Sequence, residues 1–257
     1  MPVATLASGI ISLSVCLLLS SLAYYKHVLT KAGTIAAFFV GLAIGILGDI
    51  TWLILLLFFL ISSFAATRYR FALKEAMGVQ EGRKGERGAT NVLANGIAPM
   101  TAAVLSSLAT PLLPVEWAGI VFLSALAVAG ADTIASEIGV LSDKARLITT
   151  FKPVKAGTDG GISALGEVCA IAASLYIALF GWVVLYLISG QIGMRVTLPH
   201  ESWLIFIPST IGFIGCQIDS VLGATLETKG YLHKKGVNLV STCIGALMAY
   251  SLLLWLA

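Results

Sequence analysis

The sequence predicts an all-α polytopic membrane protein with about eight transmembrane helices. Of its 257 residues, 58% are hydrophobic and only 11% are charged, whereas a soluble domain is about 25% charged. The mean hydropathy is +0.96. Several apolar stretches reach or approach the ~20 residues that a helix needs to cross a bilayer. We therefore treat residues 1–257 as a single integral membrane domain.

Eight apolar segments follow one another along the chain, separated by seams that are charged or rich in Gly and Pro. The first segment lacks a basic leader and a small-residue cleavage site, so we expect a retained span rather than a signal peptide. The second and third are joined through Gly48 and Asp49, which predicts a helical hairpin. The segments cover about residues 3–23, 32–47, 50–66, 95–113, 117–136, 163–188, 203–222 and 238–256.

The basic residues orient these segments in the membrane. Of the sixteen Lys and Arg residues, all except Arg195 fall in the loops that follow odd-numbered segments. Loops rich in Lys and Arg stay in the cytoplasm, so both termini are expected on the non-cytoplasmic side. We expect a prokaryotic cytoplasmic membrane, with the polar active-site loops facing the cytoplasm. These loops cover about residues 24–31, 67–94, 137–162 and 223–237.

Cysteine and histidine give no sign of a disulfide framework or a zinc site. The four cysteines are spread one to an apolar segment without a CxxC motif, and the three histidines stand alone. Cysteines placed in this way are typical of small core residues. No Ser/His/Asp or Cys/His set is visible, and nothing indicates nucleic-acid binding.

The motif ADTIASEIG, residues 131–139, places two carboxylates at the end of the fifth apolar segment. An ionised carboxylate in hydrocarbon costs several kcal/mol unless it is paired, metal-bound or facing a polar cavity. Asp132, Ser136 and Gly139 fall on one helical stripe, while Glu137 lies about 140° from Asp132. Both acids can line one cavity if the helix frays or packs at a corner. The alternative is that they cap the helix end or pair with a lysine.

A third carboxylate lies in GCQIDSVLGATLE, residues 215–227. Asp219 sits near the end of the seventh segment, and Glu227 follows two helical turns later on the same face. An acid so near a membrane span suggests a metal or cation site. The simpler alternative is a helix-end acid paired with Lys229.

The loop FKPVKAGTDGGISALGE, residues 151–167, combines lysines with glycines. Glycines let backbone N–H groups approach an anion, and lysines supply point charges for phosphate. The next helix should start near Ile162, with its positive dipole end toward the loop. The alternative is a basic loop touching anionic lipid. The residues concerned are Lys152, Lys155, Gly157, Thr158, Asp159, Gly160 and Gly161.

Polar residues also open the fourth and eighth segments. In RKGERGATNVLANG, residues 83–96, Arg87 precedes Asn91 and Asn95, and Asn238 opens the last segment. Asparagine at such a position is often only a helix cap, and each basic residue by itself can simply follow the positive-inside rule.

These groups are all expected at one membrane surface, and their combination predicts magnesium chemistry on phosphates. Mg²⁺ is bound by one or two carboxylates together with water and substrate oxygens. Lys, Arg and backbone N–H groups neutralise the remaining phosphate charge. Phosphoryl transfer needs mainly positioning and charge neutralisation from the protein. The apolar body would hold a lipid-like acceptor.

The motifs GATNVLANG, ADTIASEIG, LITTFKPVKAGTDGGIS, DSVLGATLE and VNLVSTCIGA occur in this order. Together with LTKAGTIAAFFVGLAIGILG they resemble the successive blocks of the transmembrane-protein-19 family, also called domain of unknown function 92. The resemblance covers about residues 29–250. Characterised plant members are phytyl-phosphate kinases that use CTP or another nucleoside triphosphate. More distantly, the layout is similar to that of CTP-dependent polyprenol kinases and CDP-diacylglycerol synthases.

The resemblance implies roles for individual residues. Mg²⁺ would be held by acids of the fifth and seventh segments, the nucleotide phosphates would lie in the glycine loop, and the remaining polar groups would complete the site around donor or acceptor phosphate. No plastid address is present, so the acceptor implied is a prenyl monophosphate, such as phytyl or geranylgeranyl phosphate. The metal ligands would be Asp132, Glu137 and Asp219, which together with Asn91 would be the catalytic residues. The phosphate contacts would be Lys152, Lys155, Thr158, Asp159, Gly160, Gly161, Arg87, Asn91 and Asn238.

Three functions remain open at this point. The first is a CTP-dependent prenyl-phosphate kinase that makes the prenyl diphosphate. The second is a lipid cytidylyltransferase, which releases pyrophosphate and makes a CDP-lipid. The third is a cation-coupled transporter, which predicts acids near the membrane midplane and an inverted repeat.

The GxxxG pattern of Gly41 and Gly45 packs helices within one chain or in a homodimer.

Overall fold

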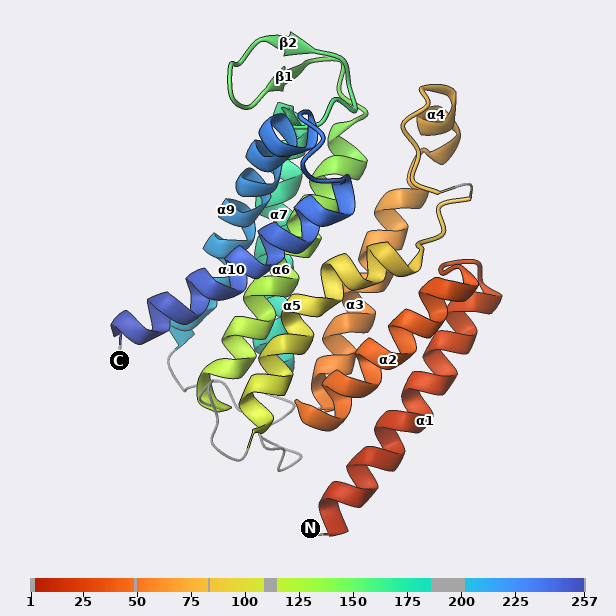
Figure 1. The fold of residues 1–257 in the computed structure, drawn as a ribbon, viewed down its shortest axis with the longest axis vertical. Coiled ribbons are helices and arrows are strands. Elements are labelled where there is room, and N and C mark those ends of the chain that lie inside the picture. Colours follow the sequence, from red (N-terminus) through yellow and green to blue (C-terminus); the bar gives the residue numbers. More distant parts are fainter. Residues whose placement is uncertain (1–2, 49, 83, 109–114, 186–201, 257) are drawn as a thin grey trace.

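The structure is a computed structural model that describes residues 3–48, 50–82, 84–108, 115–185 and 202–256. It is a bundle of long helices with one small sheet (Figure 1). Arg195 and the ends of the predicted segments 95–113 and 163–188 lie outside the described residues. The elements are α1 (Val3–Tyr25), α2 (Lys31–Leu47), α3 (Ile50–Arg68), α4 (Phe71–Ala76), α5 (Ala89–Ser107), α6 (Val115–Gly139), β1 (Ala145–Leu147), β2 (Pro153–Val154), β3 (Gly161–Ile162), α7 (Ala164–Val183), η2 (Ser202–Ile205), α9 (Phe206–Leu222), the π-helical turn η3 (Gly223–Glu227) and α10 (Lys234–Leu256).

The long helices confirm the predicted class of helical membrane protein. Among the described residues, six helical stretches are long and apolar enough to cross a membrane. They belong to α1, α3, α6, α7, α9 with η3, and α10. The predicted second segment forms α2, a shorter apolar helix of 17 residues. The fourth forms the 19-residue α5, which contains Pro99. The count of eight spans therefore stays a prediction.

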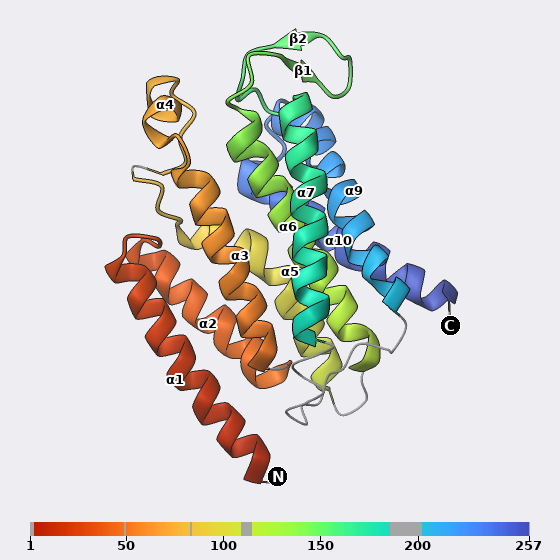
Figure 2. The same ribbon diagram turned by 180° about the vertical axis from the view of Figure 1, so that it is seen from behind.

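Helix α6 is the central helix of the bundle. It packs against α3, α5, α7, α9 and α10 (Figure 2). Within its span Trp117–Gly139, 83% of the residues are buried inside the protein, as expected of a helix that is apolar on all sides. Helix α2 packs on α5, and α1 packs on α2. The motif ADTIASEIG therefore sits at one end of the most enclosed helix.

Two glycines bring α9 and α10 close to α6. A Cβ atom on Gly215 or on Gly245 would collide with the side chain of Val128. Asp132 lies one helical turn beyond Val128 on α6, and Asp219 lies one turn beyond Gly215 on α9. The close approach at Val128 thus places these two carboxylates next to each other.

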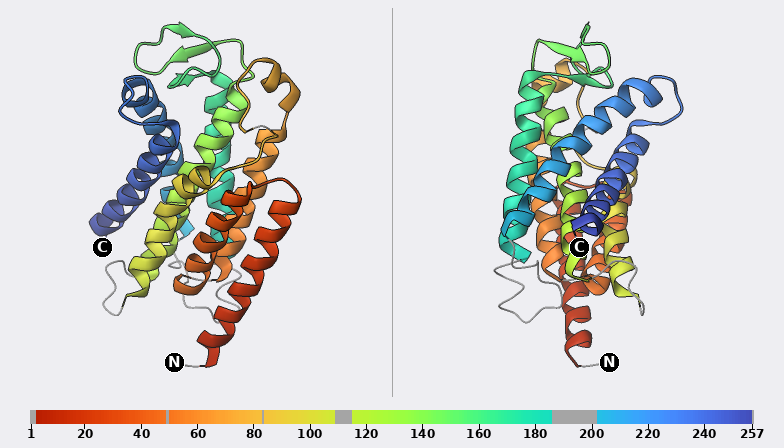
Figure 3. Two further views of the ribbon diagram at one scale, coloured as in Figure 1. Left: turned by 45° about the vertical axis from the view of Figure 1, so that its right-hand side comes forward. Right: turned by 90° about the vertical axis from the view of Figure 1, so that its left-hand side faces the viewer.

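The loops predicted to face the cytoplasm share one end of the molecule. The sheet, α4 and the turns after α1 and α9 all lie toward this end, whereas the N-terminus lies at the other end (Figures 1 and 3). Helix α10 runs obliquely across the bundle (Figure 3). The described parts of these loops therefore lie toward the same end, while the predicted topology, including the side of the membrane that they face, stays a prediction.

The loop after α6 contains a small antiparallel sheet that the all-α prediction did not include. Its strand order is β2-β1-β3, and Arg146 pairs with both Pro153 and Ile162. The strands have only two or three residues, too few to show the alternation of polar and apolar residues that indicates a strand. Helix α7 then begins at Ala164, with Ser163 as its N-cap, two residues after the predicted start.

Candidate functional site

A polar cavity of about 440 Å³ opens at the loop end of the bundle. Residues of α6, the 140–163 loop, α7, α9 with η3, α10 and the segment 78–81 contribute to its wall. This volume lies within the ~300–1,000 Å³ range of small-molecule sites. The residues singled out from the sequence that line it are Asp132, Ser136, Glu137, Gly139, Gly157, Thr158, Asp159, Gly160, Gly161, Asp219, Glu227 and Asn238.

Two carboxylates from α6 and α9 meet in this cavity. The carboxyl groups of Asp132 and Asp219 lie close enough to interact directly with each other. Asn238 Nδ2 donates to Asp132 Oδ2 at 3.1 Å, and Ser241 Oγ donates to Asp219 Oδ2 at 2.7 Å. Two carboxylates in contact repel each other unless a proton or a cation lies between them. Oxygen ligands of this kind suit a hard cation such as Mg²⁺.

Glu137 was predicted to join these two aspartates as a metal ligand, and the structure does not group it with them. Its Oε2 atom accepts a hydrogen bond from Lys74 Nζ at 2.6 Å, and its Oε1 atom accepts one from Thr67 Oγ1 at 3.0 Å. Among the described residues, no three side chains of His, Cys, Asp and Glu lie close enough to hold a metal ion. The physical reason is the 100° turn per residue of α6, which points Glu137 toward α3 and α4.

Lys74, the ion-pair partner of Glu137 behind the cavity wall, was not singled out from the sequence. Its side chain is fully buried, with 0% exposure, and Nζ also donates to Ala66 O at 3.0 Å. It is one of several basic residues in a loop predicted to face the cytoplasm, so the positive-inside rule already accounted for it.

The glycine turn, residues 157–161, forms part of the cavity wall. Gly157 and Gly160 have φ values of +83° and +71°, which favour glycine. A Cβ on Gly160 would also collide with Ala224 of η3, so glycine is needed for the turn to close on the end of α9. Thr158 Oγ1 donates to Lys155 O at 2.8 Å. The turn is thereby held beside the carboxylate pair.

The two lysines predicted to contact nucleotide phosphates do not line the cavity. Lys152 and Lys155 are exposed on either side of β2. Among the described residues, Lys234 is the only Lys or Arg that lines the cavity. Its charge interacts with the carboxylates of Glu81, Asp132, Glu137 and Asp159. The sequence signal for it was weak, namely a basic residue one helical turn before Asn238.

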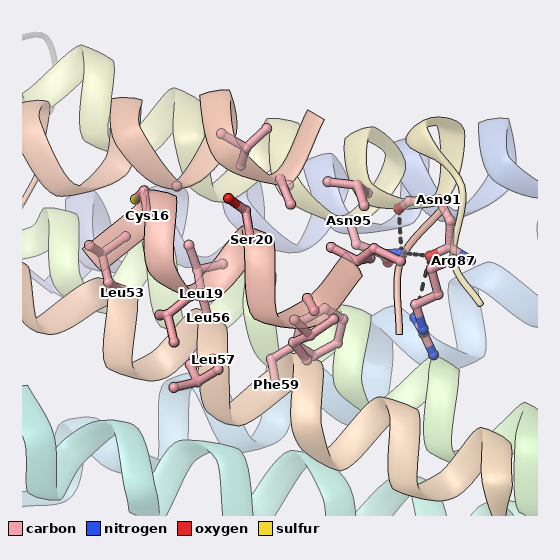
Figure 4. A pocket seen from close by; sticks show the side chains of 18 residues that line it. Cys16, Leu19, Ser20, Leu53, Leu56, Leu57, Phe59, Arg87, Asn91 and Asn95 are labelled. Atoms are coloured by element: carbon pink, nitrogen blue, oxygen red, sulfur yellow. Dashed lines mark hydrogen bonds between the residues drawn. The ribbon is translucent and has the colours of Figure 1, made fainter. Parts of the chain in front are cut away.

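Arg87 and Asn91 lie next to the polar cavity and line a second, apolar pocket (Figure 4). Arg87 is 4% exposed, and its backbone is fixed between the α1–α2 turn and α5, because Thr30 N donates to Arg87 O at 3.0 Å. Arg87 Nη1 donates to Asn91 Oδ1 and Nη2 to Thr67 Oγ1, both at 3.3 Å. Burial lowers the pKa of the Arg87 guanidinium, although the carboxylates of Glu137 and Glu81 oppose this effect.

Glu81 connects this arginine region to the polar cavity. Its Oε1 atom accepts hydrogen bonds from Asn91 Nδ2 at 3.1 Å and from Lys235 Nζ at 2.8 Å. Burial by itself would raise the pKa of Glu81, but the charges of Lys235, Lys234 and Arg87 together outweigh burial and hold the pKa below its ordinary value. Sequence reasoning missed Glu81 because it stands alone in a charged loop.

Comparisons with known proteins identify the family. Residues 14–246 match the family described as integral membrane protein DUF92. An uncharacterized membrane protein of Methanocaldococcus jannaschii is 32% identical over 95% of this chain and 94% of its own length. Protein VTE6, chloroplastic, of Arabidopsis thaliana is 32% identical over 86% of this chain and 64% of its own length. Protein PGR of the same plant is 33% identical over 81% of this chain and 75% of its own length.

No solved structure matches this chain. The family match spans the motifs on which the sequence resemblance rests, from the glycines of α2 to the asparagine that opens α10. This chain therefore belongs to the DUF92 family of integral membrane proteins.

Proposed function

We propose that this protein is a membrane prenyl-phosphate kinase that transfers the terminal phosphoryl group of CTP, or another nucleoside triphosphate, to a prenyl monophosphate. The observation that carries the proposal is the polar cavity of about 440 Å³, which is lined both by the Asp132–Asp219 pair and by the glycine turn 157–161. A carboxylate pair, a lysine and a glycine turn together suit a nucleotide with its cation. The membrane body suits a lipid acceptor.

The residues present fit a magnesium ion. Asp132 and Asp219 would hold it, because they supply adjacent carboxylates that need a cation or a proton between them. Asn238 and Ser241 fix one oxygen of each carboxylate by hydrogen bonds, which orients the remaining oxygens. When bound, Mg²⁺ neutralises charge on the phosphate oxygens of the nucleotide. Glu137 is not included, because it is ion-paired with Lys74.

The remaining cavity residues position the two phosphates. Lys234 reaches the cavity from the start of α10 and would neutralise nucleotide phosphate charge. Thr158, Gly160 and Gly161 would let the nucleotide approach the backbone closely. Arg87 is hydrogen-bonded to Asn91, which is in turn hydrogen-bonded to Glu81 in the cavity wall. Arg87 would bind the acceptor monophosphate.

The reaction then follows ordinary phosphoryl-transfer chemistry. An oxygen of the prenyl monophosphate attacks the γ-phosphorus of CTP, the bond from that phosphorus to the β–γ bridging oxygen breaks, and CDP leaves with the electron pair. The products are the prenyl diphosphate and CDP. Because phosphate monoanions and dianions are nucleophiles already, the protein has to align the two groups and neutralise their charge rather than remove a proton.

The test is turnover by the purified protein. Geranylgeranyl monophosphate is incubated with Mg²⁺ and CTP, ATP, GTP or UTP in turn, and the products are measured by mass spectrometry. Asp132→Asn and Asp219→Asn should each lower the rate by about 10²–10³-fold, as loss of one charge-stabilising group does. Asp143→Asn is the matched control, because Asp143 is exposed in the same loop region and lies outside the cavity wall.

The products decide between the alternatives. CDP with prenyl diphosphate supports a kinase, whereas pyrophosphate with a CDP-lipid indicates a cytidylyltransferase. If no nucleotide supports turnover by the wild-type protein, or if Asp132→Asn keeps the wild-type rate, the kinase proposal is wrong.

A further inference from the structure

The second pocket lies between α1, α2, α3 and α5 and has a volume of about 120 Å³. Most of its wall is apolar, including Cys16, Ala37 and Leu57, and one end is polar, where Arg87, Asn91 and Asn95 gather (Figure 4). A site with an apolar body and a cationic end suits an amphiphile with an anionic head group.

Polar atoms at this end lack partners. Among the described residues, Arg87 Nε and Asn95 Oδ1 are buried without a hydrogen-bond partner, and both side chains are only 4% exposed. Leaving a buried donor unpaired is costly, more so on a charged group. A guanidinium that lines an apolar pocket and has an N–H to spare indicates an oxyanion ligand.

Hydrogen bonds connect this end of the pocket to the polar cavity. Arg87 contacts Asn91, whose Nδ2 donates to Glu81, and it contacts Thr67, whose hydroxyl donates to Glu137. Both glutamates line the polar cavity. An anion held by Arg87 would therefore lie at the boundary between the apolar pocket and the polar cavity.

The size of the pocket limits what it can hold. A dry apolar cavity of about 150 Å³ holds a molecule as large as benzene, so this pocket holds only a short piece of hydrocarbon. On α1 its wall runs from Ala23 to Cys16, a helical rise of roughly 10 Å. Leu19, Leu57 and Leu60 in the wall are half-buried, so the pocket opens toward the outside of the bundle, where lipid would lie.

We propose that this pocket binds the isoprene units nearest to the phosphate of the acceptor, with that phosphate against Arg87, and that the rest of the tail leaves the protein into the bilayer. This assignment rests on the proposed function and adds to it a specificity rule. The site selects the shape of the tail next to the phosphate and tolerates different lengths beyond it.

Binding measured without nucleotide tests the assignment. Native mass spectrometry of the purified protein gives the affinity for geranyl, farnesyl and geranylgeranyl monophosphates. Ala37→Phe fills the pocket and should weaken all three by the same factor, at least about tenfold. Ala32→Phe is the matched control, since it adds the same bulk to an exposed position of α2 outside the pocket. It should leave the three affinities within about twofold of wild type.

Two further measurements test whether binding needs the phosphate and which helices contact the first isoprene unit. Geranylgeraniol, which lacks the phosphate, should compete at least about tenfold more weakly than geranylgeranyl monophosphate. A monophosphate with a photoreactive group on its first isoprene unit should crosslink to α1, α2, α3 or α5. The assignment is wrong if Ala37→Phe binds like Ala32→Phe, if the alcohol competes equally, or if the crosslinks map to α7 or α9. Because no nucleotide is present, failure of the kinase proposal would show separately, as lipid binding without turnover.

Discussion

At the scale of single residues, the ion pair of Lys74 and Glu137 is a costly arrangement. Lys74 has 0% and Glu137 has 11% side-chain exposure, and their atoms Nζ and Oε2 are 2.6 Å apart. Removing two charges from water costs free energy that their attraction only partly returns. Thr67 adds a hydrogen bond to Glu137 and accepts one from Arg87. The pair therefore ties α4 and α6 to the arginine that we assign to the acceptor phosphate.

This arrangement predicts that removing either charge of the Lys74–Glu137 pair alone destabilises the protein more than removing both. Lys74→Met leaves the largely enclosed Glu137 without its partner, and Glu137→Gln leaves the fully buried ammonium unpaired, so each should lower the free energy of unfolding by about 3–5 kcal/mol. The double variant removes both charges and should recover most of this loss. Thermal unfolding in detergent measures the cycle. Additive losses in the double variant would show that the two charges do not stabilise each other.

At the scale of elements, Val128 of α6 makes close contacts with Gly215 of α9 and Gly245 of α10. They lie one helical turn away from the Asp132–Asp219 pair, so the helix spacing there sets the distance between the carboxylates. Close approach through glycine is a common way to pack membrane helices, because small residues let backbones come together. The contact itself only packs the helices. It would affect function because it sets the positions of the Asp132 and Asp219 carboxylates one helical turn away.

A change at Gly215 should thus affect both stability and activity. Gly215→Ala places a methyl group against Val128 and should cost about 1–3 kcal/mol through overpacking, together with a loss of turnover as the carboxylates move apart. Val128→Ala in the same chain makes room and should restore most of both. Gly9→Ala on α1 is the matched control, because nothing lies within 4 Å of the added Cβ. Unfolding and turnover are measured for all four proteins, and a Gly215→Ala variant that matches Gly9→Ala in both would contradict the role of this contact.

What could be predicted from the sequence differs between elements and site. Apolar length and charged seams located the long helices, because both follow directly from the thickness of a bilayer. The sheet of residues 145–162 was missed because two-residue strands have no periodicity. Asp132, Asp219 and Asn238 were singled out because a carboxylate or amide beside an apolar segment is costly unless it has a partner. Lys74, Glu81 and Lys234 were not singled out, because isolated charged residues are common in a loop rich in Lys and Arg.

At the scale of the whole molecule, the sheet region that contributes to the polar cavity lies at one end of the bundle (Figure 1). The exposed residues of the sheet region at this end include Lys144, Arg146, Lys152 and Lys155. Since translocating Lys and Arg across a membrane is unfavourable, this end should face the cytoplasm, where nucleoside triphosphates are available. The orientation is a physical requirement of the proposed function, and it can be tested without any enzyme assay.

Cysteine labelling in intact cells provides that test. In a chain whose four cysteines are replaced by alanine, Lys152→Cys marks the exposed loop end and Ser107→Cys marks the exposed end of α5 at the other side. A membrane-impermeant maleimide should label Ser107→Cys in intact cells, and Lys152→Cys only after the membrane is opened, because the bilayer blocks the reagent. Turnover by the cysteine-free chain shows that it is folded. Labelling of Lys152→Cys in intact cells would place the cavity outside, away from cytoplasmic nucleotides, and the kinase proposal would then be wrong.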